Sequence, residues 1–115
     1  MKKSPKNDPD QLGHILAAAQ ETQRFLYNHT RQEFDDDRIL QLAVEKLVQN
    51  IGEAANQLTD QFKSEHEHIP WTKMIGMRHR LVHDFTAVDL DVVWDTVIVE
   101  IPDLIAKLQR VLEDN

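Results

Sequence analysis

Apolar residues recur at steps of three and four along most of this 115-residue chain, which is the period of an amphipathic α-helix. The first such segment follows Asp10, a residue that can cap a helix, and it fades near His29 and Thr30. Its apolar positions are Leu12, Ile15, Leu16, Ala19 and Leu26. Residues 1–9 are polar and contain two prolines, so we expect them to form a flexible N-terminal arm.

A second helix is predicted over residues 34–58. Asp35, Asp36 and Asp37 would place acids in its first turn, where the helix dipole favours them. Its apolar stripe is broad enough for a central helix and contains Leu40, Val44, Leu47, Ile51, Ala55 and Leu58, widened by Ile39, Ala43 and Ala54. Gly52 costs about 1 kcal/mol in a helix interior, and the expected benefit is close approach of another helix.

Two further helices complete the pattern. Residues 62–68 are polar and predict a loop, after which Pro70 suits the first turn of a helix that runs to about Phe85. Asp89 can cap the last helix. Pro102 lies within the apolar pattern of that helix and is expected to kink it.

The composition supports a single all-α domain. The chain has only three glycines and four prolines, so it is poor in turn residues. We predict one domain over residues 10–115, a four-helix up-and-down bundle with short connections. A domain of this size buries only about two-thirds of the surface of its unfolded chain, so an oligomer that adds buried area would be unsurprising.

Charge and composition exclude several classes of site. Without cysteine there is no disulfide, thiolate nucleophile or cysteine metal site. No apolar run reaches the length of a membrane helix, so we expect a soluble cytoplasmic protein with no membrane partner. The net charge of −7 does not favour nucleic acid, so any such role needs a local basic region. Residues 63–83 provide one, with four Lys or Arg, two Glu and four of the six histidines.

The densest part of that region is "GMRHRLVHDF", residues 76–85. Its His79 and His83 are four residues apart and share one helical face, and Arg80 can reach Asp84 in the same way. Three interpretations are open. The first, favoured by residue types alone, is a solvated cationic face near a helix C-terminus. The second is a metal site in which the two histidines take a third ligand from the "HEH" at residues 66–68.

The third interpretation is phosphodiester chemistry. A histidine can accept or donate a proton near neutral pH, and an arginine can stabilise negative charge that develops on a phosphate. RNA carries its own nucleophile, the 2′-hydroxyl. A histidine and an arginine can therefore suffice without a metal.

Four blocks of sequence extend the motif. "IGEAANQL", "IPWTKMIGMRHRLVHDF", "VDLDVVWDTV" and "IPDLIAKL" resemble, in order, the HepT-like branch of the HEPN superfamily, over roughly residues 10–112. The resemblance implies an all-α, metal-independent ribonuclease that needs no cofactor. It implies a homodimer whose cleft joins two copies of the motif. It also implies the toxin half of a pair with an MntA-like nucleotidyltransferase antitoxin, and RNA as the target, of which tRNA is a reported type.

The family motif is an arginine, a polar residue, three further residues and a histidine, which Arg78, His79 and His83 match. The resemblance implies that His83 is the acid/base group and that Arg78 binds the scissile phosphate. His79 would be an auxiliary polar group. Arg80 and Lys73 are expected to add RNA contacts, with Lys73 alternatively a plain surface lysine.

One position departs from the family. Where the family has a tyrosine that accepts AMP from the antitoxin, this chain has Phe85, which has no hydroxyl; its only tyrosine, Tyr27, is in another helix. Neutralisation by direct complex formation, modification of another side chain and loss of the toxin role all stay open. The alternative function is therefore a catalytically silent HEPN module that assembles with a nucleotidyltransferase.

Three other residues have two interpretations each. Glu53 is expected to be an exposed helix acid, with orientation of Arg78 as the alternative. Trp71 and Trp94 could stack on a base, but at helical spacing they are expected to be core or interface anchors.

Overall fold

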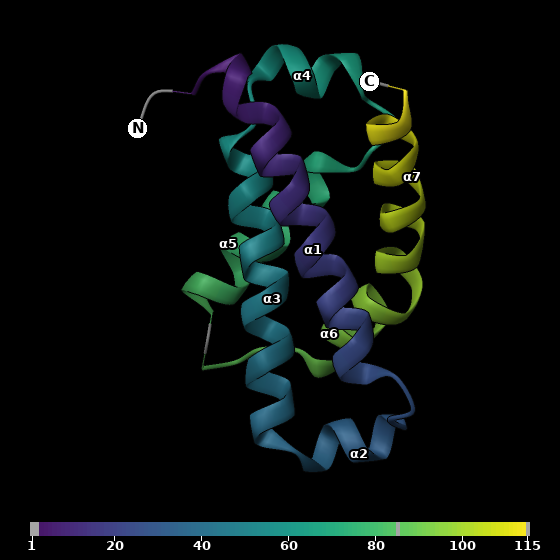
Figure 1. Cartoon of the computed structure of the whole chain (residues 1–115). Helices are drawn as coiled ribbons and strands as arrows, with labels where there is room; N and C mark the ends of the chain where they lie inside the picture. Colours follow the sequence, from purple (N-terminus) through teal and green to yellow (C-terminus); the bar gives the residue numbers. More distant parts are fainter. Residues whose placement is uncertain (1–2, 85, 115) are drawn as a thin grey trace.

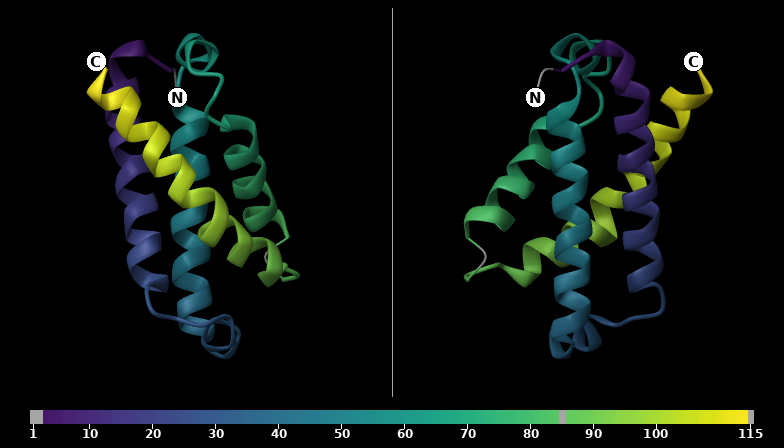
Figure 2. Two further views of the ribbon diagram at one scale, coloured as in Figure 1. Left: turned by 90° about the vertical axis from the view of Figure 1, so that its right-hand side faces the viewer. Right: turned by 60° about the vertical axis from the view of Figure 1, so that its left-hand side comes forward.

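A computed structural model describes residues 3–84 and 86–114, and all regular structure in these two ranges is helical. Four helices form the body of the molecule: α1 (Asp8–Leu26), α3 (Arg38–Gln57), α5 (Trp71–His83) and α7 (Ile101–Glu113). They alternate in direction, so α1 starts and α7 ends at the same end of the bundle (Figure 1). The last helix crosses the others obliquely (Figure 2). The predicted all-α four-helix up-and-down bundle is confirmed.

Short elements connect these helices: η1 (Pro5–Asn7), α2 (Arg31–Asp36), α4 (Asp60–Glu65), α6 (Leu90–Asp95) and the π-helical turn η2 (Thr96–Glu100). α2 and α4 close opposite ends of the bundle (Figure 1). The prediction of a loop over residues 62–68 is wrong in its first half. The Thr59 hydroxyl accepts from the Phe62 backbone N–H and caps α4. None of the helices in the described ranges is long and apolar enough to cross a membrane.

The predicted helix over residues 34–58 is divided into α2 and α3. Thr30 and Glu33 form a capping box that starts α2 before Phe34, so Asp35 lies late in that helix and not in a first turn. Asp37 is extended, and its side chain accepts from the Leu40 backbone N–H as the cap of α3. The Thr-x-x-Glu signal at residues 30–33 encodes the start of α2, so the predicted single helix over residues 34–58 is wrong.

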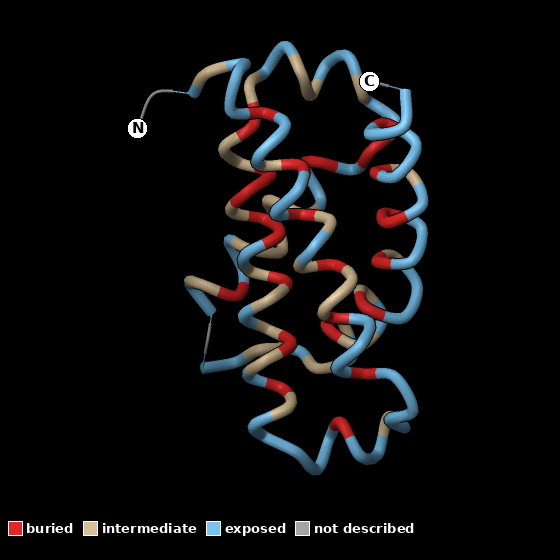
Figure 3. The backbone as a smooth tube through the Cα atoms, in the orientation of Figure 1, coloured by how far each residue is buried: buried red, intermediate tan, exposed pale blue. Residues whose placement is uncertain are grey.

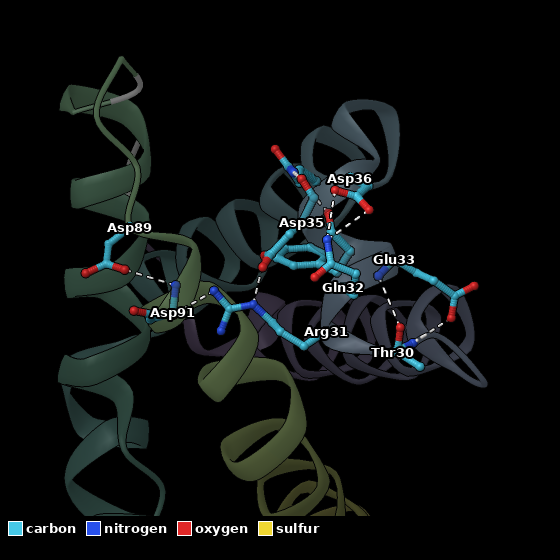
Figure 4. Close-up of polar contacts among 10 residues, drawn as sticks. Thr30, Arg31, Gln32, Glu33, Asp35, Asp36, Asp89 and Asp91 are labelled. Atoms are coloured by element: carbon cyan, nitrogen blue, oxygen red, sulfur yellow. Dashed lines mark hydrogen bonds and ion pairs between the residues drawn. The ribbon is translucent and has the colours of Figure 1, made fainter.

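Arg31 ties α2 to the start of α6 (Figure 4). Its Nε lies 2.8 Å from Asp35 Oδ1 and its Nη2 lies 2.6 Å from Asp91 Oδ1. The hydrogen bonds to Asp35 and then Asp91 raise the pKa of Arg31 above its usual value. Asp89 caps α6, as predicted, by accepting from the Asp91 backbone N–H. Solvent screens exposed pairs of this kind, so they orient α2 more than they stabilise it.

The first helix begins at Asp8, two residues before the predicted cap at Asp10, and it ends at Leu26. The Asp8 carboxylate is buried and accepts two hydrogen bonds from Thr59, from the backbone N–H at 3.0 Å and from the hydroxyl at 2.7 Å. This contact joins the start of α1 to the start of α4, which the sequence pattern did not indicate.

The predicted interruption at Pro102 is confirmed. α6 ends at Asp95 and is followed directly by the π-helical turn η2. The α-helical pattern resumes at Ile101, where α7 begins. Proline lacks the N–H that would bond the carbonyl of Ile98, four residues earlier. A wider turn is a known way for a helix to absorb such a defect.

Buried side chains form two clusters. Figure 3 shows that the buried residues alternate with exposed ones along each long helix. Trp71 belongs to the larger one, and its indole N–H donates to the His66 carbonyl at 3.0 Å. Trp94 packs on the smaller one, with its ring centroid 5.5 Å from that of Phe34. Both tryptophans are therefore core residues, as expected.

α3 is the central helix and packs against both α1 and α5. Gly52 sits where α5 approaches most closely: a Cβ added there would lie 2.5 Å from the carbonyl oxygen of Met74 and closer still to the Cβ of Arg78. The predicted role of Gly52 in close helix approach is confirmed.

Gly52→Ala is expected to destabilise the fold by about 1–3 kcal/mol, because the new methyl group must push α5 away from α3. Gly13→Ala is the control, since a Cβ on that helical glycine meets nothing within 4 Å. It is expected to stabilise the fold by roughly 0.5–1 kcal/mol through helix propensity. Urea unfolding measures both. A Gly52→Ala protein as stable as the wild type would contradict the close contact.

Candidate active site

The motif lies on α5, and its side chains point to three different sides of that helix. Arg78 faces α3, His79 and His83 face outward, and Lys73 and Arg80 border a groove on a third side. Phe85, the position of the family's tyrosine, lies outside the described residues. The motif is therefore one segment whose side chains have separate surroundings.

Arg78 is held against α3 by an acid. Its Nε lies 2.6 Å from Glu53 Oε2, and its side chain is 32% exposed. The other carboxylate oxygen of Glu53 accepts from the Gln57 side-chain amide at 3.3 Å. The favoured expectation of an exposed acid holds only in part: the Glu53 side chain is 47% exposed, but its carboxylate also contacts Arg78, which was the alternative. Because Gly52 admits the backbone of α5, the side chain of the next residue reaches the guanidinium.

His79 and His83 form an exposed pair of imidazoles. Their ring centroids are 4.3 Å apart with an interplanar angle of 45°, so the predicted shared face is confirmed. The expected ion pair between Arg80 and Asp84 does not form within residues 3–84 and 86–114. Two accessible rings therefore stand on the surface, on a helix whose other side holds Arg78.

A groove of about 780 Å³ lies between α5 and the last helix, with α3 at its base. Its walls are mostly apolar and include Met74, Met77, Val92, Val99 and Leu104. Lys73 pairs across it with Glu100 of η2, and Arg80 lines it one turn from His83. Lys73 is thus partly neutralised by an acid and contributes little to a free basic surface.

The metal interpretation needs a third ligand beside His79 and His83. In the part of the chain that the structure describes, no group of three or more His, Cys, Asp or Glu side chains is placed to hold a metal ion. His66 instead packs on Phe62, with ring centroids 4.4 Å apart. The "HEH" segment therefore supplies no ligand to the histidine pair.

The family can now be assigned, because one family model, described as Ribonuclease HepT-like, matches residues 15–111. The chain belongs to the HepT-like ribonuclease family. A "Probable ribonuclease HepT" of Thermococcus cleftensis is 36% identical over 110 residues, 96% of this chain and 97% of that protein. A "Putative RNase" of Caldanaerobacter subterraneus is 29% identical over 102 residues, 89% of this chain and 91% of that protein. No solved structure matches this chain.

The sequence of this HepT-like chain indicates the motif, and it raises the contact of Glu53 with Arg78 only as the alternative to an exposed acid. It carries no signal for the bond from Gln57 to Glu53. The signal for the Glu53 contact was Gly52: a helix-interior glycine marks the point where two helices meet, and the polar residue beside it is well placed to contact the facing helix.

The exposure of the histidines predicts how the HepT-like fold responds to their removal. His79→Ala and His83→Ala should each change stability by no more than about 0.5 kcal/mol, as exposed substitutions usually do. Arg78→Ala should cost more, since it removes the partly buried ion pair with Glu53. Thermal unfolding of the three variants measures this order. A large loss of stability in His83→Ala would contradict its surface position.

Proposed function

We propose that this protein is a metal-independent endoribonuclease and the toxin of a HepT/MntA-type pair, cleaving RNA such as tRNA. One observation carries the proposal: Arg78 and His83, in the spacing of the family motif, are both accessible on one surface helix. An arginine and a histidine in reach of solvent have the two chemical abilities that RNA cleavage requires.

In the proposed reaction His83 accepts the proton of the 2′-hydroxyl. The 2′-oxygen attacks phosphorus and forms a new P–O bond, while the bond to the 5′-oxygen breaks. Arg78 stabilises the negative charge on the non-bridging oxygens. The leaving 5′-oxygen takes up a proton from a protonated histidine on the opposite side of the phosphate, and a 2′,3′-cyclic phosphate remains. The nucleophile comes from the RNA, so the step needs no redox cofactor or added co-reactant.

Attack and departure occur on opposite sides of the phosphorus, so a base and an acid must flank the phosphate. His79 and His83 lie side by side and cannot flank it from one chain. We therefore propose a homodimer whose cleft combines two copies of the motif. A C₂ pair is the commonest closed assembly, and each copy would present the same surface to the other.

The groove beside α5 supports this homodimer. Gly76 lies on its edge in the interior of α5, and a Cβ there would meet nothing within 4 Å, so this chain alone does not explain the glycine. The groove walls carry opposite charges, Arg80 on α5 and Asp95 on α6, neither in an ion pair within the described ranges. Such a surface is complementary to a second copy of itself.

Cleavage tests the catalytic proposal. The wild type should cleave tRNA in the presence of EDTA. His83→Ala and Arg78→Ala should each lose roughly 10²–10⁴-fold in rate, the usual range for removing a general acid/base or a charge-stabilising donor. His14→Ala is the control, an exposed histidine of α1 that should not matter. Retained cleavage by His83→Ala would refute its assignment.

Association tests the homodimer. Val99 lines the groove and is 65% exposed, so Val99→Glu should leave the fold intact yet place a charge in an apolar contact. The molar mass measured by sedimentation equilibrium should fall from that of two chains to that of one chain. The rate of RNA cleavage should fall as well. Ile39→Glu, at an 81% exposed position of α3 outside the groove, should change neither. A Val99→Glu protein that still dimerises would overturn the proposed face.

Phe85 bears on how the toxin is neutralised. Because its ring has no hydroxyl, we propose that an MntA-like nucleotidyltransferase silences this protein by direct binding. The same substitution favours the second candidate, a catalytically silent module that assembles with that partner. Expression without the partner separates the two. Growth arrest that His83→Ala abolishes supports the toxin, and harmless wild-type expression supports the silent module.

A further inference from the structure

We propose that Glu53 and Gln57 are positioning residues that hold the Arg78 guanidinium with one edge toward a phosphate. This inference rests on the proposed function, since it assigns Arg78 a phosphate to bind. The two residues lie one turn apart on α3, opposite the motif on α5.

Gln57, Glu53 and Arg78 are linked by two successive polar contacts. The Gln57 amide donates to Glu53 Oε1 at 3.3 Å, and Glu53 Oε2 lies 2.6 Å from Arg78 Nε. Glu53 Oε2 is a buried atom with no hydrogen-bond partner among the described residues, so its contact with Arg78 Nε is an ion pair without hydrogen-bond geometry. The Glu53 side chain is 47% exposed, and the bond from Gln57 together with the ion pair restricts how its carboxylate turns. Arg78 therefore meets an acid that is held from two sides.

The edge that Glu53 leaves free is the useful one. A guanidinium has five N–H donors, and those on Nη1 and Nη2 form a fork that matches two oxygens of a phosphate. Within the described ranges, the Arg78 ion pair is made through Nε and no side-chain bond occupies the fork. The side chain as a whole is 32% exposed, so the proposal has the fork lie in that exposed part.

Glu53 acts on orientation and not on protonation. The guanidinium is charged at every physiological pH, with or without an acid beside it. A free arginine side chain samples many rotamers, and a phosphate would have to select the productive one. Gly52 brings the backbone of Arg78 against α3, and Glu53 then fixes the far end of the side chain. The site is thereby prepared before RNA arrives.

The first test compares Glu53→Ala, Glu53→Gln and Glu45→Ala. Glu53→Ala should lower kcat for RNA roughly 10- to 100-fold, the scale of a misplaced catalytic group. Glu53→Gln keeps a polar oxygen of the same reach beside Nε and should retain more activity than Glu53→Ala. Glu45→Ala is the matched control, because Glu45 is another α3 acid near an arginine, 3.5 Å from Arg38 Nη1 and outside the site. Full activity in Glu53→Ala would overturn the proposal.

A second test asks whether Glu53 acts through Arg78. In an Arg78→Ala background, Glu53→Ala should have no further effect, since residues that act as a unit are not additive. Added methylguanidinium should partly restore Arg78→Ala but not the double variant, because Glu53 would hold the small cation. Independent, multiplicative losses, or equal rescue of both proteins, would overturn the positioning role.

Measurements that do not depend on RNA cleavage can test the positioning role even if the proposed function fails. The ¹⁵N-labelled Arg78 Nε–H should exchange slowly in the wild type and in Glu53→Gln, and quickly in Glu53→Ala. Affinity for 2′-O-methyl RNA, which cannot be cleaved, should fall in Glu53→Ala alone. If the wild type cleaves no RNA, the proposed function fails, and the Nε–H signal still decides the positioning. An Nε–H unaffected by Glu53→Ala would refute it.

Discussion

The close packing of α5 on α3 is the constraint on which the rest of this structure depends. Gly52 has no side chain, so the backbone of α5 at Met74 and Arg78 comes to rest directly on α3. That contact sets the depth of α5 in the bundle. It decides which side of α5 is buried, which side carries the histidines, and which side borders the groove. A small change in this one distance would alter all three surfaces together.

The same contact explains how an acidic protein maintains a usable arginine. Glu53 faces Arg78 as a single acid at a single edge of the guanidinium, and Lys73 is paired across the groove with Glu100. The imidazoles of His79 and His83 stay exposed and away from these pairs. Local geometry, and not net charge, therefore determines what a phosphate would meet at this surface.

Much of the fold follows from periodicity in the sequence. The four long helices, the cap at Asp89 and the interruption at Pro102 were all predictable, because each depends on residues close in the chain. The break at Asp37 was also encoded locally, by the capping box at Thr30, but a continuous apolar pattern concealed it. The contact of Asp8 with Thr59 was not predictable, because it joins residues 51 positions apart with no local signal.

The candidate site divides in the same way. The motif could be predicted because the spacing of its residues matches the family pattern. The shared face of His79 and His83 follows from helix geometry alone. The partner of Arg78 depended on how two helices pack, which one chain's sequence indicates only through Gly52. The mid-helix position of Glu53 favoured an exposed acid over a partner of Arg78, and the packing of α5 on α3 adds the contact while leaving the side chain 47% exposed.

The π-helical turn η2 changes the register of the buried positions between α6 and α7. Buried positions Val93, Val97 and Ile101 follow one another at steps of four, which on an ideal helix would drift by about 40° per step. A wider turn takes up that drift, so one core face continues from α6 into α7. The turn therefore shifts the helical register by less than one residue for each step of four. Inserting or deleting one residue between the Asp89 cap and Pro102 would rotate the core face of α7 by about 100° relative to that of α6.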